Sequence, residues 1–343
     1  MALNSKKGIF YTIISISLMG LIIYAFSIGF TPKMQQKSYA ASSVVNAMDN
    51  FYEDITKDME RAAHICAFRA ILSLEQYIFE SGKYVGEETP AIEESFEELF
   101  MNGTLDGTPY FLMENNTFQN WTQKMISQAN DLYIVMNYSI IDFQLYQDDP
   151  WSIKTNINLS IDLKDRLGVA RFDRKIFVTG VVDIDDFDDP FYTIKTSQDY
   201  IVKFRRTPYR AQFVLNGTNA TNLELHANGS YYVASPSAPS FLQRFENDLT
   251  ASDNGIESLI NPKVQPYLVV GRCGYSTPKT NFYNRSIVDY IYCTSQNNLS
   301  YKNYTVTGLP SWLIIDNRSI IYNSTYNISR HEFYGITNLT IEN

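Results

Sequence analysis

The chain has 343 residues, of which 45% are hydrophobic, and its formal net charge at pH 7 is −9. A surplus of acidic residues repels phosphate backbones, which excludes nucleic acid as a primary partner. The three cysteines are too few for a fold built on disulfides, so the burial of apolar side chains must supply its stability.

The first predicted element is an apolar helix over residues 9–30. This stretch, IFYTIISISLMGLIIYAFSIGF, carries no charged residue. It is longer than the apolar part of an ordinary cleaved signal, and a helix of this length crosses about 30 Å of hydrocarbon. The sequence therefore predicts a transmembrane helix in contact with membrane lipid, preceded by a short leader over residues 1–8 that is cytoplasmic or cleaved.

N-glycosylation sequons follow this segment, and none precedes it. Their density exceeds what ordinary composition gives, although an Asn-, Ser- and Thr-rich composition is the alternative explanation. Sequons that are used lie outside the cytoplasm and on the protein surface. We therefore expect a single-pass protein of the cell membrane with a cytoplasmic N-terminus and an extracellular, glycosylated C-terminal region. The candidate sites are Asn102, Asn115, Asn120, Asn137, Asn158, Asn216, Asn219, Asn228, Asn284, Asn298, Asn303, Asn317, Asn323, Asn327 and Asn338.

A stalk helix is predicted over residues 31–82, continuous with the apolar helix. Between Gln35 and Phe79 neither Pro nor Gly interrupts the chain. Apolar or small residues recur there in steps of three and four, which places them on one helical face. Cys66 belongs to this face, and we expect it to be a buried small side chain rather than a reactive thiol. The face consists of Val45, Met48, Tyr52, Ile55, Met59, Ala62 and Cys66.

Residues 83–192 are predicted to form a domain of one helix and an antiparallel sheet. Thr89 and Pro90 are typical of a helix start, with Thr89 as the cap, and the helix should end near Phe100. Apolar and polar residues alternate from Trp151 to Leu163, as in a half-buried strand. The stalk helix is expected to pack its apolar face on this sheet. The other strand candidates are residues 133–143 and 175–184.

Residues 193–343 are predicted to form a second, β-rich and glycosylated domain. The turn Asp188-Asp189-Pro190 redirects the chain just before it, which suggests a boundary after residue 192. One short helix is expected within this domain, in the segment SFLQRFENDL. Its apolar side would consist of Phe241, Leu242, Phe245 and Leu249.

The acidic run between Ile184 and Pro190 is the best candidate metal site. Calcium accepts several carboxylate and carbonyl oxygens, and extracellular calcium sites are often weak. Phe187, however, stands where an EF-hand loop has its third ligand, and no Gly follows. A solvated loop at a strand end is therefore favoured over a calcium site. The candidate ligands are Asp183, Asp185, Asp186, Asp188 and Asp189.

Residues that carry catalysis are sparse. His64, His226 and His331 are isolated in the sequence, and no zinc-peptidase, serine-hydrolase or phosphate-loop motif is present. We expect a structural role for His64 beside the helix face and surface positions for the other two. No enzymatic activity and no cofactor are predicted, and an ectoenzyme is the weakest alternative.

The spacing of Cys273 and Cys293 permits a disulfide in an oxidising compartment. Such a bridge would close a loop of about twenty residues and contribute roughly 3 kcal/mol. The alternative is a pair of free thiols in the core.

Lys6, Lys7 and Gly8 stand directly before a helix that is apolar first and amphipathic later. This start resembles the class III signal of archaeal type IV pilin-like proteins, which are membrane-anchored surface proteins. The resemblance implies cleavage between Gly8 and Ile9, packing of the helix with other pilin-like subunits, and surface-layer components as further partners. Major pilins have Glu at the fifth mature position, where this chain has Ile13. The departure argues against a repeating position in a filament and implies a minor subunit at the tip or the start.

The expected fold class is α+β, with a long N-terminal membrane-spanning helix that continues into an amphipathic stalk helix packed on an antiparallel sheet, followed by a second β-rich domain. The expected function is that of a non-enzymatic cell-surface protein, a pilin-like minor subunit of a type IV filament-like assembly. The alternative is an unprocessed, single-pass glycosylated adhesion protein that does not polymerise.

Overall fold

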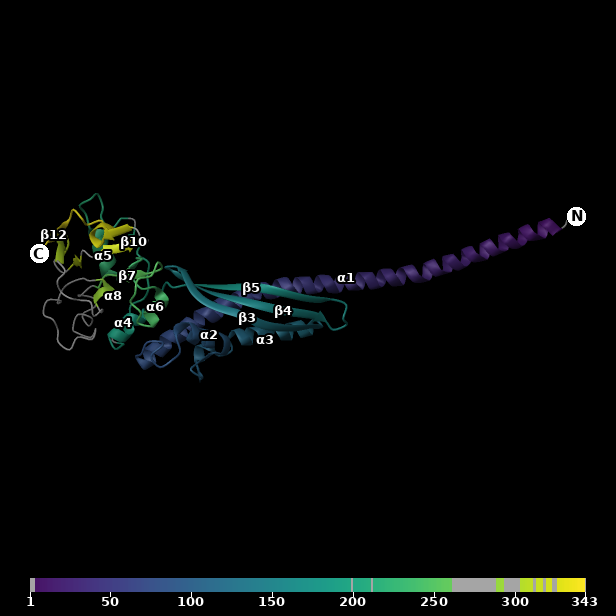
Figure 1. Cartoon of the computed structure of the whole chain (residues 1–343), viewed down its shortest axis with the longest axis horizontal. Helices are drawn as coiled ribbons and strands as arrows, with labels where there is room; N and C mark the ends of the chain where they lie inside the picture. Colours follow the sequence, from purple (N-terminus) through teal and green to yellow (C-terminus); the bar gives the residue numbers. More distant parts are fainter. Residues whose placement is uncertain are drawn as a thin grey trace. The chain divides into compact units, whose positions relative to one another are not determined.

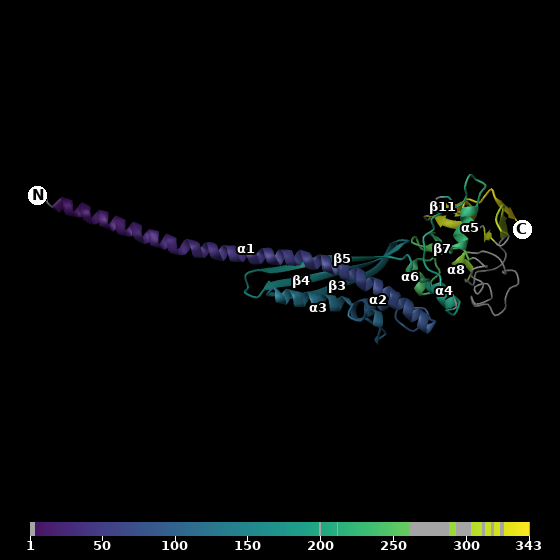
Figure 2. The same cartoon turned by 180° about the vertical axis from the view of Figure 1, so that it is seen from behind.

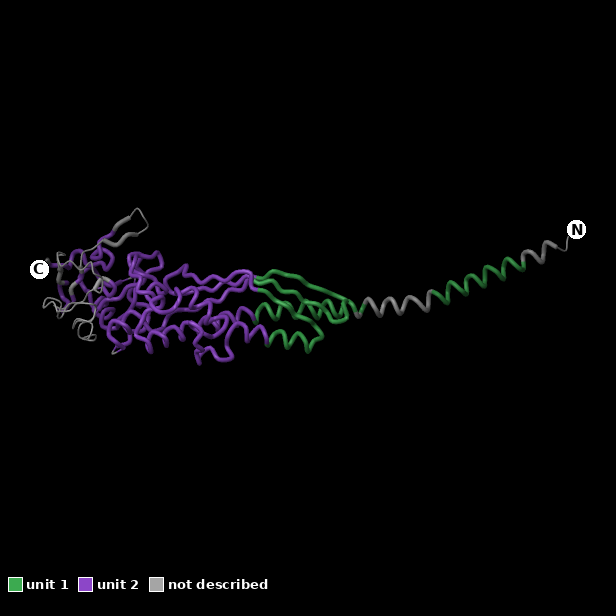
Figure 3. Tube along the Cα trace, turned by 60° about the horizontal axis from the view of Figure 1, so that its bottom comes forward, with its two compact units in different colours: residues 1–58, 124–139, 159–176 green, residues 59–123, 140–158, 177–343 purple. Residues whose placement is uncertain are grey.

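A computed structural model describes most of the chain and divides it into two compact units (Figures 1 and 3). Unit 1 comprises residues 1–58, 124–139 and 159–176, and unit 2 comprises residues 59–123, 140–158 and 177–343. The described residues are 4–198, 200–210, 212–260, 288–292, 303–310, 313–316, 319–322 and 326–342.

A single helix, α1 (Asn4–Ser81), opens the chain and is unbroken in both views (Figures 1 and 2). It includes Pro32, which has no backbone N–H to donate, and the helix does not end there. The helix stops at Gly82, which has a φ of 67° and donates its N–H to the Ile78 carbonyl at 2.9 Å. A glycine in the left-handed region is the usual residue just beyond a helix C-terminus, because it has no Cβ to clash.

The predicted transmembrane helix over residues 9–30 is wrong, because no helix in the described part of the chain is both long and apolar enough to cross a membrane. The predicted single-pass location in the cell membrane, with a cytoplasmic N-terminus and an extracellular C-terminal region, is corrected with it. Side chains are described for residues 10–26 of this segment, where Ser15, Ser17 and Gly20 interrupt the apolar residues.

Three long strands form an antiparallel sheet in the order β3-β4-β5. In β4 alternate residues from Ile153 onward are buried, so the predicted alternation over Trp151–Leu163 is confirmed. Connections of only a few residues between successive long strands favour this antiparallel arrangement. The strands are β3 (Ile134–Asp149), β4 (Ser152–Asp165) and β5 (Arg171–Asp183).

Unit 1 has a small core of its own. From α1 it buries Met48, Phe51 and Ile55, which belong to successive turns of the helix. The other apolar side chains buried in unit 1 come from α3 (Phe118–Asp131) and the three strands, and include Met125, Ala129, Ile134, Met136, Leu159, Ile161, Leu163 and Ile176.

In unit 2 the helix and the sheet approach each other closely at Gly180. A Cβ added to Gly180 would lie 2.8 Å from the backbone carbon of Ala63, so only glycine fits this position without a shift. The facing side of α1 is accordingly lined with small buried side chains, among them Ala62 and Ala67. Cys66 is buried on this side and donates its thiol to the Asn116 carbonyl at 3.0 Å, which confirms the prediction of a buried side chain.

The helix predicted after Thr89 is α2 (Ile92–Asn102), but Thr89 does not cap it. The Thr89 hydroxyl instead accepts the N–H of Gly86 at 3.1 Å. The N–H of Ile92 donates to the carboxylate of Glu246 at 2.8 Å, so a residue distant in the sequence satisfies the helix start. A hairpin of β1 (Thr104–Leu105) and β2 (Thr108–Pro109) and the 3-10 helix η1 (Phe111–Met113) follow.

The described remainder of unit 2 mixes short helices with short strands. Residue 192, where the sequence suggested a boundary, lies inside helix α4. The described helices are α4 (Pro190–Lys195), α5 (Thr221–Asn228), α6 (Phe241–Phe245), α8 (Asp289–Tyr292) and α9 (Arg330–Phe333). The described strands are β6 (Tyr232–Ala234), β7 (Ile256–Ser258), β8 (Asn303–Val306), β9 (Ile314–Asp316), β10 (Ser319–Tyr322), β11 (Tyr326–Ser329) and β12 (Thr340–Glu342).

These strands form small antiparallel sheets, β6-β7, β10-β11 and β12-β8-β9. An apolar cluster that includes Phe213, Leu223, Leu313 and Tyr334 packs among them. The α+β class with antiparallel sheets therefore agrees with the sequence-based expectation.

Candidate functional site

The five predicted calcium ligands are engaged by basic side chains. Asp183 and Asp185 both pair with Arg206, and the Asp185–Arg206 distance is 3.0 Å. The Asp188 carboxylate lies 3.4 Å from Lys203. In the same way Asp186 faces Arg205 at 3.5 Å and Asp189 faces Arg244 at 2.7 Å. No group of acidic, His or Cys side chains in the described residues is arranged to hold a metal ion.

Apart from Arg244, the basic residues come from a segment that pairs with the acidic run through its backbone. The N–H of Asp186 donates to the Phe204 carbonyl at 2.8 Å, and the N–H of Asp189 donates to the Val202 carbonyl at 2.7 Å. The run KFRR, residues 203–206, follows the acidic run closely in the sequence. This nearness is the signal that could have indicated the pairing, which the sequence analysis did not predict. The acidic run is thus one half of a charge-paired ladder.

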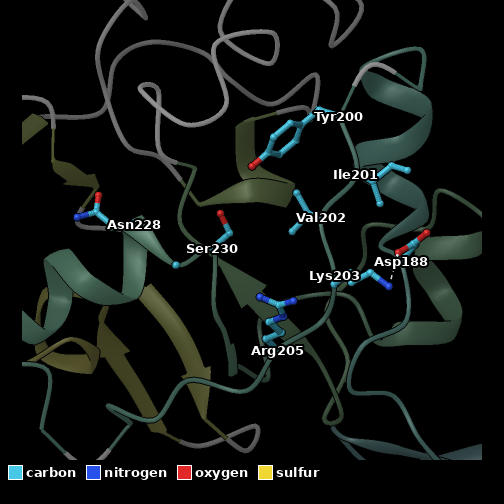
Figure 4. A pocket seen from close by; sticks show the side chains of 9 residues that line it. Asp188, Tyr200, Ile201, Val202, Lys203, Arg205, Asn228 and Ser230 are labelled. Carbon is cyan, nitrogen blue, oxygen red and sulfur yellow. Dashed lines mark ion pairs between the residues drawn. The ribbon is translucent and has the colours of Figure 1, made fainter.

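A cavity of about 430 Å³ opens beside this ladder in unit 2 (Figure 4). The ammonium of Lys203 points to Asp188, while the side chains of Tyr200 and Arg205 frame the hollow. The other lining residues are Ile201, Val202, Asn228, Gly229 and Ser230. Both basic side chains of the lining already have acidic partners, since Arg205 faces Asp186.

The predicted processing residues Lys6, Lys7, Gly8 and Ile9 all lie within the first turns of α1. The Gly8–Ile9 peptide bond is therefore helical in the intact chain. The predicted disulfide partners Cys273 and Cys293 lie outside the described residues.

Most sequon asparagines whose side chains are described are exposed, and none of these is fully buried. Asn158 is half-buried, and its side-chain oxygen has no hydrogen-bond partner. The exposed ones are Asn102, Asn115, Asn137, Asn216, Asn219, Asn228 and Asn338, and Asn120 is half-buried. Only the backbone is described for Asn303 and Asn327, while Asn284, Asn298, Asn317 and Asn323 lie outside the described residues.

Two of the three histidines do not lie where the sequence suggested. His226 and His331 were expected at the surface, and both are buried. His331 lies 3.1 Å from the Ile315 carbonyl, whereas neither ring nitrogen of His226 has a hydrogen-bond partner. Burial lowers the pKa of His226 to about 3, so its ring is neutral. His64 is exposed and contacts the Val181 carbonyl at 2.6 Å.

A buried ionic cluster, which the sequence did not predict, gathers around Arg244 of α6. The guanidinium lies 2.7 Å from the Asp189 carboxylate and 2.9 Å from the Asp289 carboxylate, and all three side chains are inaccessible to solvent. It also donates to the Ile256 carbonyl at 2.6 Å. The Tyr232 hydroxyl completes the cluster by donating to Asp189 at 2.7 Å.

A second buried cluster lies on the opposite face of β7. Glu257 accepts hydrogen bonds from Arg330 at 2.9 Å and from the Tyr334 hydroxyl at 2.9 Å. Arg330 also donates to the Tyr290 hydroxyl at 2.9 Å. Successive residues of a strand point to opposite faces, so Glu257 and its neighbour Ser258 serve different clusters. No local pattern in the sequence signals either cluster, because the partners come from distant segments.

The N-terminal part of α1 has an exposed apolar surface. Twelve large apolar side chains lie between Phe10 and Phe26, and each is at least 45% exposed. The sequence has no charged residue in this stretch. Comparisons with protein families, with curated proteins and with solved structures give no match for the chain.

Proposed function

We propose that the chain is a non-enzymatic, pilin-like minor subunit of a surface filament-like assembly, joined to its neighbours through residues 10–26 of α1. The observation that carries this proposal is the exposure of the apolar side chains along that stretch. Contiguous apolar surface of this extent usually marks an interaction site.

The apolar residues surround the helix on all sides. Ile13, Leu18 and Met19 point in different directions around the axis, and each is at least 58% exposed. A helix that is hydrophobic all round is normally buried by other elements. Burial of each large side chain contributes roughly 1.5–3 kcal/mol, so a few such contacts offset the cost of association.

The absence of charge in this stretch suits helix-to-helix packing between subunits. No carboxylate or ammonium group would be left unpaired at such an interface. The start Lys6-Lys7-Gly8, which resembles a pilin signal, supports the same assignment. Ile13 in place of Glu supports a minor position, because the subunit does not offer the carboxylate that a repeating position uses.

The proposal is tested by self-association of the full chain, measured by sedimentation velocity. The double variant Ile16→Lys/Ile23→Lys places two charges on one helical face and should convert oligomers to monomers. Leu167→Lys is the matched control, since Leu167 is 84% exposed but lies outside α1. It should assemble as the wild type does.

The N-terminus of the native protein provides a second test. Mass spectrometry should find Ile9 as the first residue if the leader is processed. An intact Met1 together with a monomeric wild-type chain would contradict the proposal and favour the surface glycoprotein that does not polymerise.

A further inference from the structure

Two carboxylates share one guanidinium in the interior of unit 2. Asp189 and Asp289 lie 2.7 and 2.9 Å from Arg244, and none of the three side chains is accessible to solvent. If both acids are ionised, the cluster carries one uncompensated negative charge. Burying such a charge is costly, and two acids that share a site favour protonation of one of them.

The hydrogen bonds assign the proton to Asp289. Asp189 accepts donors on both oxygens, from the Phe191 N–H at 2.9 Å and from Tyr232 and Arg244 at 2.7 Å. Asp289 accepts the Tyr290 N–H at 2.8 Å on one oxygen, and its second oxygen lies 2.9 Å from Arg244 and 3.3 Å from the Ser258 hydroxyl. Since a hydroxyl both donates and accepts, Ser258 is able to take a hydrogen bond from protonated Asp289.

Ser258 in turn lies 2.9 Å from the Tyr192 hydroxyl, and either of these two atoms can donate. The donors and acceptors in this series of hydrogen bonds, Tyr192–Ser258–Asp289, therefore exchange roles when Asp289 gains or loses its proton. Burial, opposed only in part by Arg244, raises the pKa of Asp289 to about 6.

The other titratable groups near Asp289 do not compensate for its charge at neutral pH. Burial raises the pKa values of Tyr192, Tyr232, Tyr290 and Tyr334, which stay neutral. Glu257 and Arg330 pair with each other at 2.9 Å. Among the described residues, the charged or titratable groups that face Asp289 are thus Arg244, Asp189, Tyr192, Tyr232, Tyr290 and Tyr334, with the Glu257–Arg330 pair beyond them.

Asp289 is the first residue of α8, and its side chain is buried together with those of Val288 and Tyr290. Val288 forms a β-bridge with Leu259, and Tyr290 receives a hydrogen bond from Arg330. We propose that α8 is a proton-dependent latch, held on the core when Asp189 and Asp289 share a proton and held more weakly when both are ionised.

The sign of the effect follows from proton linkage. When α8 opens, Asp289 returns to water and to an ordinary pKa of 3.8, while in the closed state its pKa is about 6. The closed state therefore binds the proton more tightly, and raising the pH favours opening. The opening equilibrium should increase roughly tenfold per pH unit between about pH 4 and pH 6, by about 150-fold in total, and level off above pH 6.

Hydrogen exchange of the α8 amides in the full chain tests this proposal. Rates measured from pH 4 to pH 7.5, and corrected for the intrinsic pH dependence of exchange, should show the rise and the plateau. Asp289→Asn resembles the protonated acid, so at pH 7.5 its α8 amides should exchange up to about 100-fold more slowly than those of the wild type. The exposed Asp253→Asn is the matched control and should leave the wild-type profile unchanged.

A second variant tests whether the pH dependence requires two acids that share Arg244. Asp189→Asn keeps an oxygen that caps α4 but leaves Arg244 with Asp289 alone, so the pH dependence between pH 4 and pH 6 should disappear. The double variant Asp189→Asn/Asp289→Asn strands a buried cation and should exchange faster than either single variant.

Two results would overturn the latch. One is a corrected wild-type rate that does not change between pH 4 and pH 6. The other is faster exchange in Asp289→Asn than in the wild type at pH 7.5, which would mean that Asp289 acts only as an ionised partner of Arg244.

Discussion

His226 lies in the core of unit 2, on α5, with its ring 5.1 Å from that of Phe213. Neither nitrogen has a hydrogen-bond partner, so the fold bears the desolvation cost of a neutral imidazole. The folded state resists protonation because burial lowers the pKa to about 3, while the unfolded chain takes up a proton near pH 6.5. Stability is therefore lost as the pH falls below 6.5.

We predict that His226→Leu removes this loss. Relative to pH 7.5, the free energy of unfolding of the wild type at pH 4.5 should be lower by about 2–3 kcal/mol through His226. The variant should lack this decrease. Chemical denaturation at pH 4.5 and pH 7.5 measures the difference. Equal pH dependence of the wild type and the variant would mean that the ring reaches a proton acceptor or water.

Glu75 on α1 has the opposite effect. It accepts the N–H of Asp188 at 2.6 Å, and burial together with the nearby Asp188 charge raises its pKa to about 8. The folded state thus holds a proton that the unfolded chain releases near pH 4.5. Stability therefore declines as the pH rises from about 4.5 to about 8.

The variant Glu75→Gln keeps the acceptor oxygen and carries no titrating group. Between pH 6 and pH 8 we expect the free energy of unfolding of the wild type to fall by about 2 kcal/mol through Glu75. The variant should not show this part of the decrease. Thermal unfolding across this range is the measurement. A steeper decline in the variant would show that ionised Glu75 is the stabilising form, paired with Lys203.

At the scale of elements, the contact between α1 and β5 depends on the absence of a side chain. A Cβ at position 180 would meet the Thr155 hydroxyl at 2.6 Å and the Ala63 backbone at 2.8 Å. Backbone on both elements would have to move, because Ala63 lies inside a long helix.

We predict that Gly180→Ala destabilises unit 2 by about 1–3 kcal/mol. Gly20→Ala is the control, since nothing lies within 4 Å of a Cβ there and Ala is the better helix former. The denaturant midpoint of Gly180→Ala should be lower than that of the wild type. The midpoint of Gly20→Ala should be equal to that of the wild type or higher. An unchanged midpoint for Gly180→Ala would mean that the helix and the strand separate at little cost.

The elements themselves followed from short-range patterns. The alternation in β4 and the steps of three and four in α1 depend on residues within a few positions of one another, so the sequence alone reveals them. The cap of α2 by Glu246 could not be predicted in this way, because the partner is 154 residues away. The helix Thr221–Asn228 was missed for a related reason, since its weak apolar periodicity gave no helical signal before its buried side was known.

At the scale of the whole molecule, an uncharged apolar stretch of α1 is joined to a chain of net charge −9. Association through the stretch brings like-charged subunits together, and their repulsion is screened as the salt concentration rises. We therefore predict that self-association strengthens by roughly a few-fold between 50 mM and 500 mM NaCl. Sedimentation velocity at both salt concentrations is the measurement, and weaker association at high salt would point to an interface built on ion pairs.

The sequence by itself determined the periodic elements, the acidic balance and the apolar start, because each is visible in neighbouring residues or in composition. Only the tertiary structure decided which charges meet. It paired Asp183–Asp189 with residues 203–206 and Arg244, and it placed His226 in the core. Such pairings depend on the path of the chain between distant segments, and burial changes the proton affinity of a side chain only after that path has enclosed it.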